Sequence, residues 1–93
     1  MDEYVVYVLY SPNSDRIYIG FTSALIDRFY SHNTYSKKGH TIRYRPWIVL
    51  EVEFFRTKSE AMTREKQLKS GQGRKYIREM VIPKYQKIGF ISA

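Results

Sequence analysis

The sequence lacks cysteine altogether and has few acidic side chains, and each shortage restricts what the protein can be. None of its 93 residues is a cysteine, so disulfides and thiolate metal sites are impossible. No apolar run approaches the ~20 residues that a membrane-spanning helix needs, and the chain does not start with a basic and then apolar leader. We therefore expect a soluble, cytoplasmic protein without membrane contact, folded as a single domain over residues 1–93.

Acidic residues number nine against sixteen lysines and arginines, and the imbalance is confined to one part of the chain. Residues 1–55 carry six basic and six acidic side chains, whereas residues 56–93 carry ten and three. The whole net charge of +7 therefore arises from the C-terminal part. Such an asymmetry favours a polyanionic partner because it attracts phosphates over a long range. A merely soluble basic surface gives the same composition.

The N-terminal residues have the pattern of a β-hairpin. Residues 4–10 read Y-V-V-Y-V-L-Y and residues 16–21 read R-I-Y-I-G-F, two β-branched and aromatic runs separated by S-P-N-S-D. A third run, P-W-I-V-L-E-V-E-F-F at 46–55, predicts another strand, which its opening proline allows because no ladder donor is needed there. Tyr7 and Tyr18 can act together only on one sheet face. In an antiparallel pair this requires facing residues whose numbers sum to an odd value.

Three further segments have helical patterns. Residues 23–32 follow candidate capping residues and repeat apolar side chains at the spacing of one buried stripe. Within them, Arg28 and His32 lie four apart and so share a face at the edge of that stripe. A capping box, T-K-S-E at 57–60, predicts a second helix over residues 59–70 that stops at Gly71. Residues 74–82 carry a third stripe, which we expect the following proline to end.

A carboxylate falls on the buried stripe of the helix predicted over residues 59–70. At about 100° per residue, Ala61, Met62 and Leu68 define the inward face. Glu65 lies among them, four residues after Ala61 and three before Leu68. An uncompensated charge there costs several kcal/mol and is normally paired or bound to a metal. On the pattern alone a salt bridge to Arg28 or to a lysine is the simpler explanation, and a metal site is the alternative.

Taken in order, these residues resemble the GIY-YIG nuclease superfamily, in particular its small stand-alone branch. Val5 stands where the family name has glycine, but the tyrosine that the family chemistry needs is present as Tyr7. The resemblance implies one GIY-YIG-like domain with an α+β fold, in which about three helices flank a small, mainly antiparallel, three-stranded sheet. The matching stretches are V-V-Y at 5–7, Y-I-G at 18–20, T-S-A-L-I-D-R-F-Y-S-H-N at 22–33, R-P-W at 45–47, E-A-M-T-R-E-K-Q-L-K at 60–69 and G-R-K at 73–75.

The resemblance also implies a reaction and a set of residues. The reaction is metal-dependent hydrolysis of DNA phosphodiester bonds, with Glu65 as the metal ligand and Tyr7, Tyr18, Arg28 and His32 as the catalytic residues. A single glutamate suits Mg²⁺, with Mn²⁺ as the alternative, because such an ion keeps most of its waters. Arg28 can hold a phosphate oxygen with its fork of donors. Which tyrosine acts as base stays open, since either needs a neighbouring cation; His32 could supply it or relay the proton.

Four basic residues near the C-terminus, Lys69, Arg74, Lys75 and Arg78, are the candidates for binding the DNA backbone. Without an appended DNA-reading element, we expect recognition of structure, such as branched or single-stranded regions, rather than of sequence. The alternative function is a non-catalytic nucleic-acid-binding module on the same fold. We prefer the enzyme because all five catalytic and metal-binding positions hold residues that are competent for the chemistry.

Overall fold

The computed structural model describes residues 4–25, 33 and 43–91. Within them, one strand lies at the centre of a sheet and pairs antiparallel with a neighbour on each side, in the order β2-β1-β3. The predicted three-stranded antiparallel sheet is therefore confirmed. The last strand begins two residues later than expected, after a cis peptide bond between Arg45 and Pro46. The strands are β1 (Tyr4–Ser11), β2 (Arg16–Thr22) and β3 (Ile48–Phe55).

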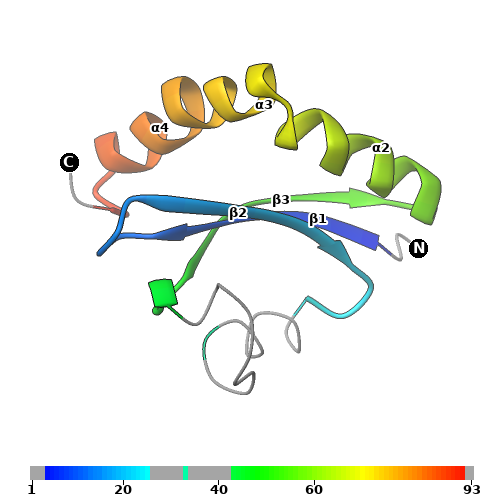
Figure 1. The fold of residues 1–93 in the computed structure, drawn as a ribbon, viewed down its shortest axis with the longest axis horizontal. Helices are drawn as coiled ribbons and strands as arrows, with labels where there is room; N and C mark the ends of the chain where they lie inside the picture. Colours follow the sequence, from blue (N-terminus) through cyan, green and yellow to red (C-terminus); the bar gives the residue numbers. More distant parts are fainter. Residues whose placement is uncertain (1–3, 26–32, 34–42, 92–93) are drawn as a thin grey trace.

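Helices cover one face of this sheet (Figure 1). The first begins at the cap Thr57, whose hydroxyl accepts a hydrogen bond from the Glu60 amide at 3.2 Å. The same hydroxyl donates to Oε1 of Glu60 at 3.0 Å. The N-cap bond of the predicted capping box is therefore formed, and the Glu60 side chain turns back to the Thr57 hydroxyl. The helical elements are α2 (Lys58–Lys69), α3 (Gly71–Tyr76), the π-helical segment η3 (Ile77–Val81) and α4 (Ile82–Lys87).

Pro83 does not end the last helix, so that prediction is wrong. The helical turns predicted over residues 74–82 begin at Gly71 and continue to Lys87. In η3 the N–H of Ile82 bonds to the carbonyl of Ile77, five residues back, which widens the turn just before the proline. Pro83 then occupies one of the first positions of α4, where a missing N–H costs least.

Ser70 closes α2 and opens α3. Its backbone N–H bonds to the carbonyls of Lys66 and Gln67, and its hydroxyl accepts from the Gly73 amide at 3.1 Å. A Cβ on Gly73 would stand 2.5 Å from Cα of Leu68, so only glycine lets the two helices approach this closely. The resulting bend between α2 and α3 is visible in Figure 1.

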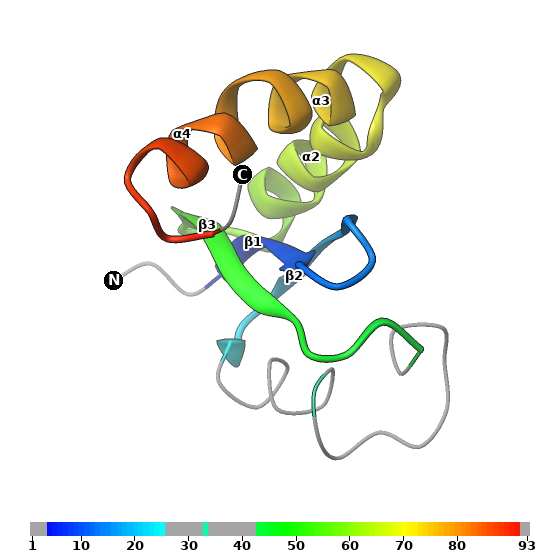
Figure 2. The same cartoon turned by 90° about the vertical axis from the view of Figure 1, so that its left-hand side faces the viewer.

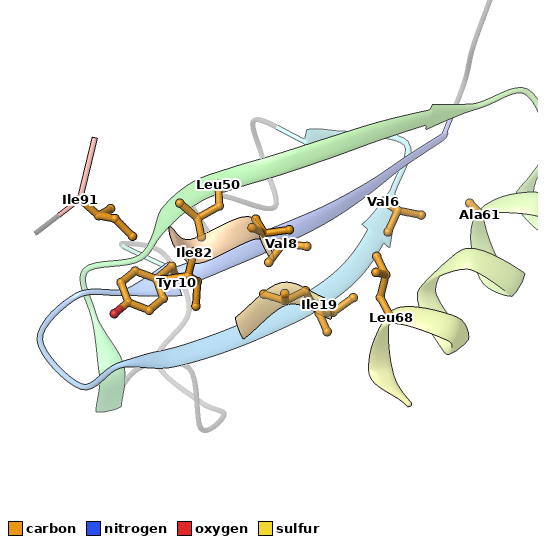
Figure 3. Packing of buried hydrophobic residues seen from close by; sticks show 11 residues of the cluster. Val6, Val8, Tyr10, Ile19, Leu50, Ala61, Leu68, Ile82 and Ile91 are labelled. Atoms are coloured by element: carbon orange, nitrogen blue, oxygen red, sulfur yellow. The ribbon is translucent and has the colours of Figure 1, made fainter. Parts of the chain in front are cut away.

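The larger hydrophobic core fills the space between the sheet and the helices (Figure 3). Ala61 and Leu68 of α2 are 0% and 3% exposed, as their predicted stripe requires. Met62, predicted to share that stripe, is 38% exposed, and for this residue the prediction is wrong. The inward positions recur every three and then four residues, and Met62 lies one residue away from them. The buried members are Val6, Val8, Tyr10, Ile19, Leu50, Ala61, Leu68, Ile77, Val81, Ile82 and Ile91.

The opposite face of the sheet carries a smaller cluster, here called the aromatic face, in which Tyr7, Leu9 and Trp47 are buried. In Figure 2 the segment that leads into β3 lies on this side of the sheet, away from the helices. Tyr7 faces Gly20 and Leu9 faces Tyr18 across the β1–β2 pair. The numbers in each pair sum to an odd value, so the predicted condition is met and both tyrosines lie on this face.

Two carboxylates of β3 tie the helices to the sheet. Oε1 of Glu51 accepts hydrogen bonds from Nζ of Lys84 at 2.6 Å and from the Tyr85 hydroxyl at 2.9 Å. Glu53 receives two bonds from the Arg64 guanidinium, at 2.8 and 3.1 Å. Burial acts to raise the pKa of Glu51, but the bonds from Lys84 and Tyr85 together outweigh it and the pKa is lowered. The alternating glutamates of β3 therefore face the helices as anchors.

Candidate active site

Tyr7 of β1 and Tyr18 of β2 stack on the aromatic face, with ring centroids 6.3 Å apart and an angle of 22° between the planes. Gly20 lies directly opposite Tyr7. A Cβ on Gly20 would stand 2.7 Å from Cζ of Tyr7 and closer still to the hydroxyl oxygen. The glycine therefore leaves the space that the Tyr7 phenol occupies, which is the physical reason for a glycine two residues after Tyr18.

An open hollow of about 480 Å³ joins the tyrosine pair to the first turns of α2. We call it the β2–α2 hollow. Tyr7, Tyr18 and Glu65 all line it, so the structure brings together three of the five predicted catalytic and metal-binding residues. Arg28 and His32 lie outside the described residues. The complete lining is Tyr4, Tyr7, Tyr18, Gly20, Phe21, Thr22, Ser23, Lys58 and Glu65.

Glu65 occupies the inward stripe of α2, as the pattern predicts, and its side chain is 18% exposed. Its carboxylate lies 3.6 Å from Nζ of Lys69, so the partner foreseen by the salt-bridge alternative is one turn further along the helix. This pair is looser than the other ion pairs between described residues, which measure 2.6 to 2.8 Å. The carboxylate thus has lone pairs left for a further ligand.

The donor set around Glu65 suits some metal ions and not others. No group of three or more histidine, aspartate, glutamate or cysteine side chains that could hold a metal ion occurs among the described residues. A zinc site needs three or four such ligands, so Glu65 does not fit zinc within this part of the chain. Mg²⁺ and Mn²⁺ accept one carboxylate and complete their shells with water and phosphate. A lone, half-buried carboxylate in an open hollow fits those ions.

Two residues that the sequence patterns did not single out support Tyr18. The ring of Trp47 meets Tyr18 edge-on, with centroids 6.2 Å apart, and Tyr44 meets Trp47 in the same way at 6.3 Å. The Asn33 amide holds the Trp47 backbone by accepting from its N–H at 2.6 Å and donating to its carbonyl at 2.8 Å. Asn33 and Trp47 belong to the matching stretches of the sequence, but only the fold shows that they meet.

The four predicted DNA-binding residues differ in how they are engaged. Lys69 pairs within its own helix, and Arg74 donates from Nε to a backbone carbonyl at 3.2 Å. Arg78 reaches the hairpin turn, where it donates to Oδ1 and to the backbone oxygen of Asp15 at 2.8 and 2.7 Å. Lys75 is exposed and belongs to none of the ion pairs that join described residues. No helix in the described part is long and apolar enough to cross a membrane.

Comparison with known proteins gives one result for the chain. The family model of the GIY-YIG catalytic domain matches residues 3–77. The matched range includes β1, β2 and β3, the whole of α2 and every residue that lines the β2–α2 hollow. No curated protein and no solved structure gives a significant match.

Proposed function

Because the chain belongs to the GIY-YIG catalytic domain family, whose fold is of the nuclease type, we propose that it is a metal-dependent endonuclease that hydrolyses DNA phosphodiester bonds. One observation carries the proposal: Tyr7, Tyr18 and Glu65, which come from three separate elements, line one open hollow. Two phenols and a carboxylate around a solvent-accessible space are the groups that phosphodiester hydrolysis needs for proton transfer and for metal binding.

Glu65 is the residue that would hold the divalent ion, with Mg²⁺ as the first candidate and Mn²⁺ as the second. When bound, such an ion supplies positive charge next to the phosphate and so lowers the barrier to hydrolysis. The carboxylate is fixed for this role because α2 packs against the sheet through Ala61 and Leu68, on either side of Glu65. The ion pair with Lys69 further limits the rotamers of the carboxylate.

The proposed role of the tyrosines is proton transfer with the attacking water. Stacking against Tyr18 and the space over Gly20 fix the ring of Tyr7, while Trp47 contacts Tyr18 edge-on. A phenol with an ordinary pKa near 10 becomes a base only next to positive charge. An ion held by Glu65 would supply that charge, and Arg28 and His32 are the further candidates from the sequence.

Replacing Glu65 by glutamine tests the proposal. Glu65→Gln keeps the size of the side chain but removes the charge that binds the ion, so we expect cleavage to fall at least about a hundredfold. The melting temperature should change by less than about 5 °C, which is roughly 1 kcal/mol for a chain of this size. Both proteins are incubated with branched, single-stranded and duplex DNA in Mg²⁺, Mn²⁺ or chelator, and circular dichroism follows their unfolding.

Glu79→Gln is the matched control, because it makes the same chemical change at an exposed position of η3 that does not line the hollow. It should cleave like the wild type. A wild type that binds DNA but cuts none of the substrates with either ion would favour the alternative, a non-catalytic nucleic-acid-binding module. A large loss of stability in Glu65→Gln without any metal-dependent activity would return Glu65 to a purely structural salt bridge.

A further inference from the structure

Lys58 shares the β2–α2 hollow with Glu65, yet neither the sequence patterns nor the proposed mechanism gives it a role. The two residues are seven apart in α2, which places them on the same side of the helix and about 10 Å apart along its axis. Ala61 and Leu68 fall on the same stripe and are buried. Along this side of α2, charged and buried apolar residues therefore alternate, in the order Lys58, Ala61, Glu65 and Leu68. Both charged residues line the hollow.

Helix stability does not explain a lysine at position 58. Lys58 is the first residue of the twelve-residue α2, where the helix dipole is positive and a cation is unfavourable. The cap and the acidic residue that a helix start calls for are already supplied by Thr57 and Glu60. Four ion pairs join described residues, and Lys58 takes part in none of them. Its ammonium group is therefore available, within this part of the chain, to an anionic ligand.

We propose that Lys58 binds a phosphate of the DNA strand next to the phosphate that is hydrolysed, and so positions the strand along the hollow. This inference rests on the proposed function and adds a requirement to it, a substrate with at least two phosphates. Because Lys58 lies about two helical turns from Glu65, its ammonium is placed for a neighbouring phosphate rather than for the reacting one. Lys58 is in this view a substrate-binding residue.

Two substrates with different numbers of phosphates distinguish a specific phosphate contact of Lys58 from a general attraction between its positive charge and the substrate. Bis(p-nitrophenyl) phosphate carries one phosphate, whereas the tetranucleotide of thymidine carries three. Lys58→Ala should raise KM for the tetranucleotide about tenfold, the effect of one charged hydrogen bond, with little change in kcat. Hydrolysis of the one-phosphate ester should stay unchanged. Lys58→Arg, which keeps the charge, should recover most of the lost affinity.

Binding of the tetranucleotide in chelator gives a readout that does not depend on cleavage. Titration calorimetry at low salt should show Kd about tenfold weaker for Lys58→Ala than for the wild type. Lys66→Ala is the matched control, since it removes a lysine from the same helix but outside the hollow, and it should leave Kd nearly unchanged. Circular dichroism melting verifies that each variant is folded.

The outcomes for Lys58 and for the proposed function are distinguishable. Equal losses of tetranucleotide affinity in Lys58→Ala and Lys66→Ala would overturn the role of Lys58. So would a loss of activity in Lys58→Ala that is as large for the one-phosphate ester as for the tetranucleotide. A wild type that binds no tetranucleotide in chelator would overturn it as well. A wild type that cuts neither substrate, but whose binding is weakened by Lys58→Ala alone, would refute the nuclease and leave the phosphate site standing.

Discussion

Gly20 faces Tyr7 on the neighbouring strand, and its missing side chain determines where the tyrosine hydroxyl can lie. Nothing about the glycine itself requires unusual backbone angles, because it sits in the regular ladder of β2. The glycine is needed because the Tyr7 phenol lies directly against its Cα. The phenol fills the space that the methyl group of an alanine would take. A residue with no chemistry thus holds in place one that the proposed mechanism depends on.

Gly20→Ala is therefore expected to displace Tyr7. The added methyl group overpacks the buried ring, which should cost about 1–3 kcal/mol of unfolding free energy and lower cleavage by a factor of at least ten. Urea unfolding and cleavage kinetics measure the two effects. Gly71→Ala is the control, because no atom would lie within 4 Å of its Cβ. Similar behaviour of the two variants would show that close contact at Gly20 does not matter.

For single residues, the sequence indicated which side chains are candidates for the site better than it indicated which side chains contact each other. The family resemblance singled out Tyr7 and Tyr18. Helical spacing placed Glu65 on the buried stripe, because such spacing depends only on neighbours along the chain. The contact between Asn33 and Trp47 joins residues fourteen apart through a stretch without a regular period. Lys58 lay on the same helical stripe as Glu65, but a lysine at a helix start is commonplace in a sequence. Its place in the hollow became visible only with β2 beside it.

At the scale of elements, β3 is held to the helices by charge as well as by apolar packing. Glu51 accepts from Lys84 and Tyr85 of α4, and Glu53 binds Arg64 of α2. The pKa of Glu51 is lowered, because the bonds from Lys84 and Tyr85 outweigh the opposing effect of burial. The carboxylate is thus favoured in its charged form more strongly in the folded state than in the unfolded chain.

This shift gives a prediction with a definite sign. A depressed folded-state pKa contributes stability above the unfolded value, near 4.3, and that contribution disappears as the pH falls through the lower folded-state pKa. Glu51→Gln should therefore be less stable than the wild type at pH 7, on the order of 1 kcal/mol. The difference should shrink as the pH falls below about 4. Urea unfolding at several pH values measures it.

Glu79→Gln again serves as the control, because Glu79 is exposed and belongs to none of the ion pairs between described residues. Its stability should follow the wild type at every pH. A deficit of Glu51→Gln that stays constant down to pH 3 would mean that the carboxylate acts through its shape rather than its charge.

Within the described residues, element types were predictable from local patterns, whereas the length of the last helix was not. Most of the helix predicted over residues 23–32 lies outside these residues. The strands and α2 follow from β-branched runs and a capping box, which act over a few residues. The continuation through Pro83 depends on the widened turn at Ile77 and Ile82, a hydrogen-bond arrangement that has no simple sequence pattern. The exposure of Met62 was likewise not predictable, because it depends on which side of α2 packs against the sheet.

For the molecule as a whole, the sixteen lysines and arginines are not equally free to meet DNA. Arg64, Lys69, Arg78 and Lys84 all pair with carboxylates of the same chain. Arg78 joins the end of the hairpin turn to the helical layer through Asp15, which also accepts from the Tyr10 hydroxyl at 2.8 Å. The hydrogen bond from Tyr10 and the bond to Arg78 lower the pKa of Asp15.

Lys75 and Arg78 should consequently differ in their effect on DNA binding. Lys75→Ala is expected to reduce the slope of log Kd against log salt concentration by about one, the loss of a single phosphate contact. Its unfolding free energy should stay within about 0.5 kcal/mol of the wild type. Arg78→Ala should change the slope less and lower the stability slightly, by no more than about 1 kcal/mol for so exposed a pair. Mobility-shift titrations at several salt concentrations measure the slopes, and equal slopes for both variants would refute the distinction.

Trp47 is the single tryptophan of the chain, and it lies buried between Tyr18 and Tyr44. Light absorbed by those two tyrosines passes readily to an indole at such short range, so the tryptophan emission of the protein comes from one ring beside the candidate tyrosine pair. Anything that moves Tyr18 or admits water to the aromatic face alters the colour or intensity of that emission. The molecule thus contains its own optical reporter, in contact with one of the two candidate tyrosines and readable without any attached label.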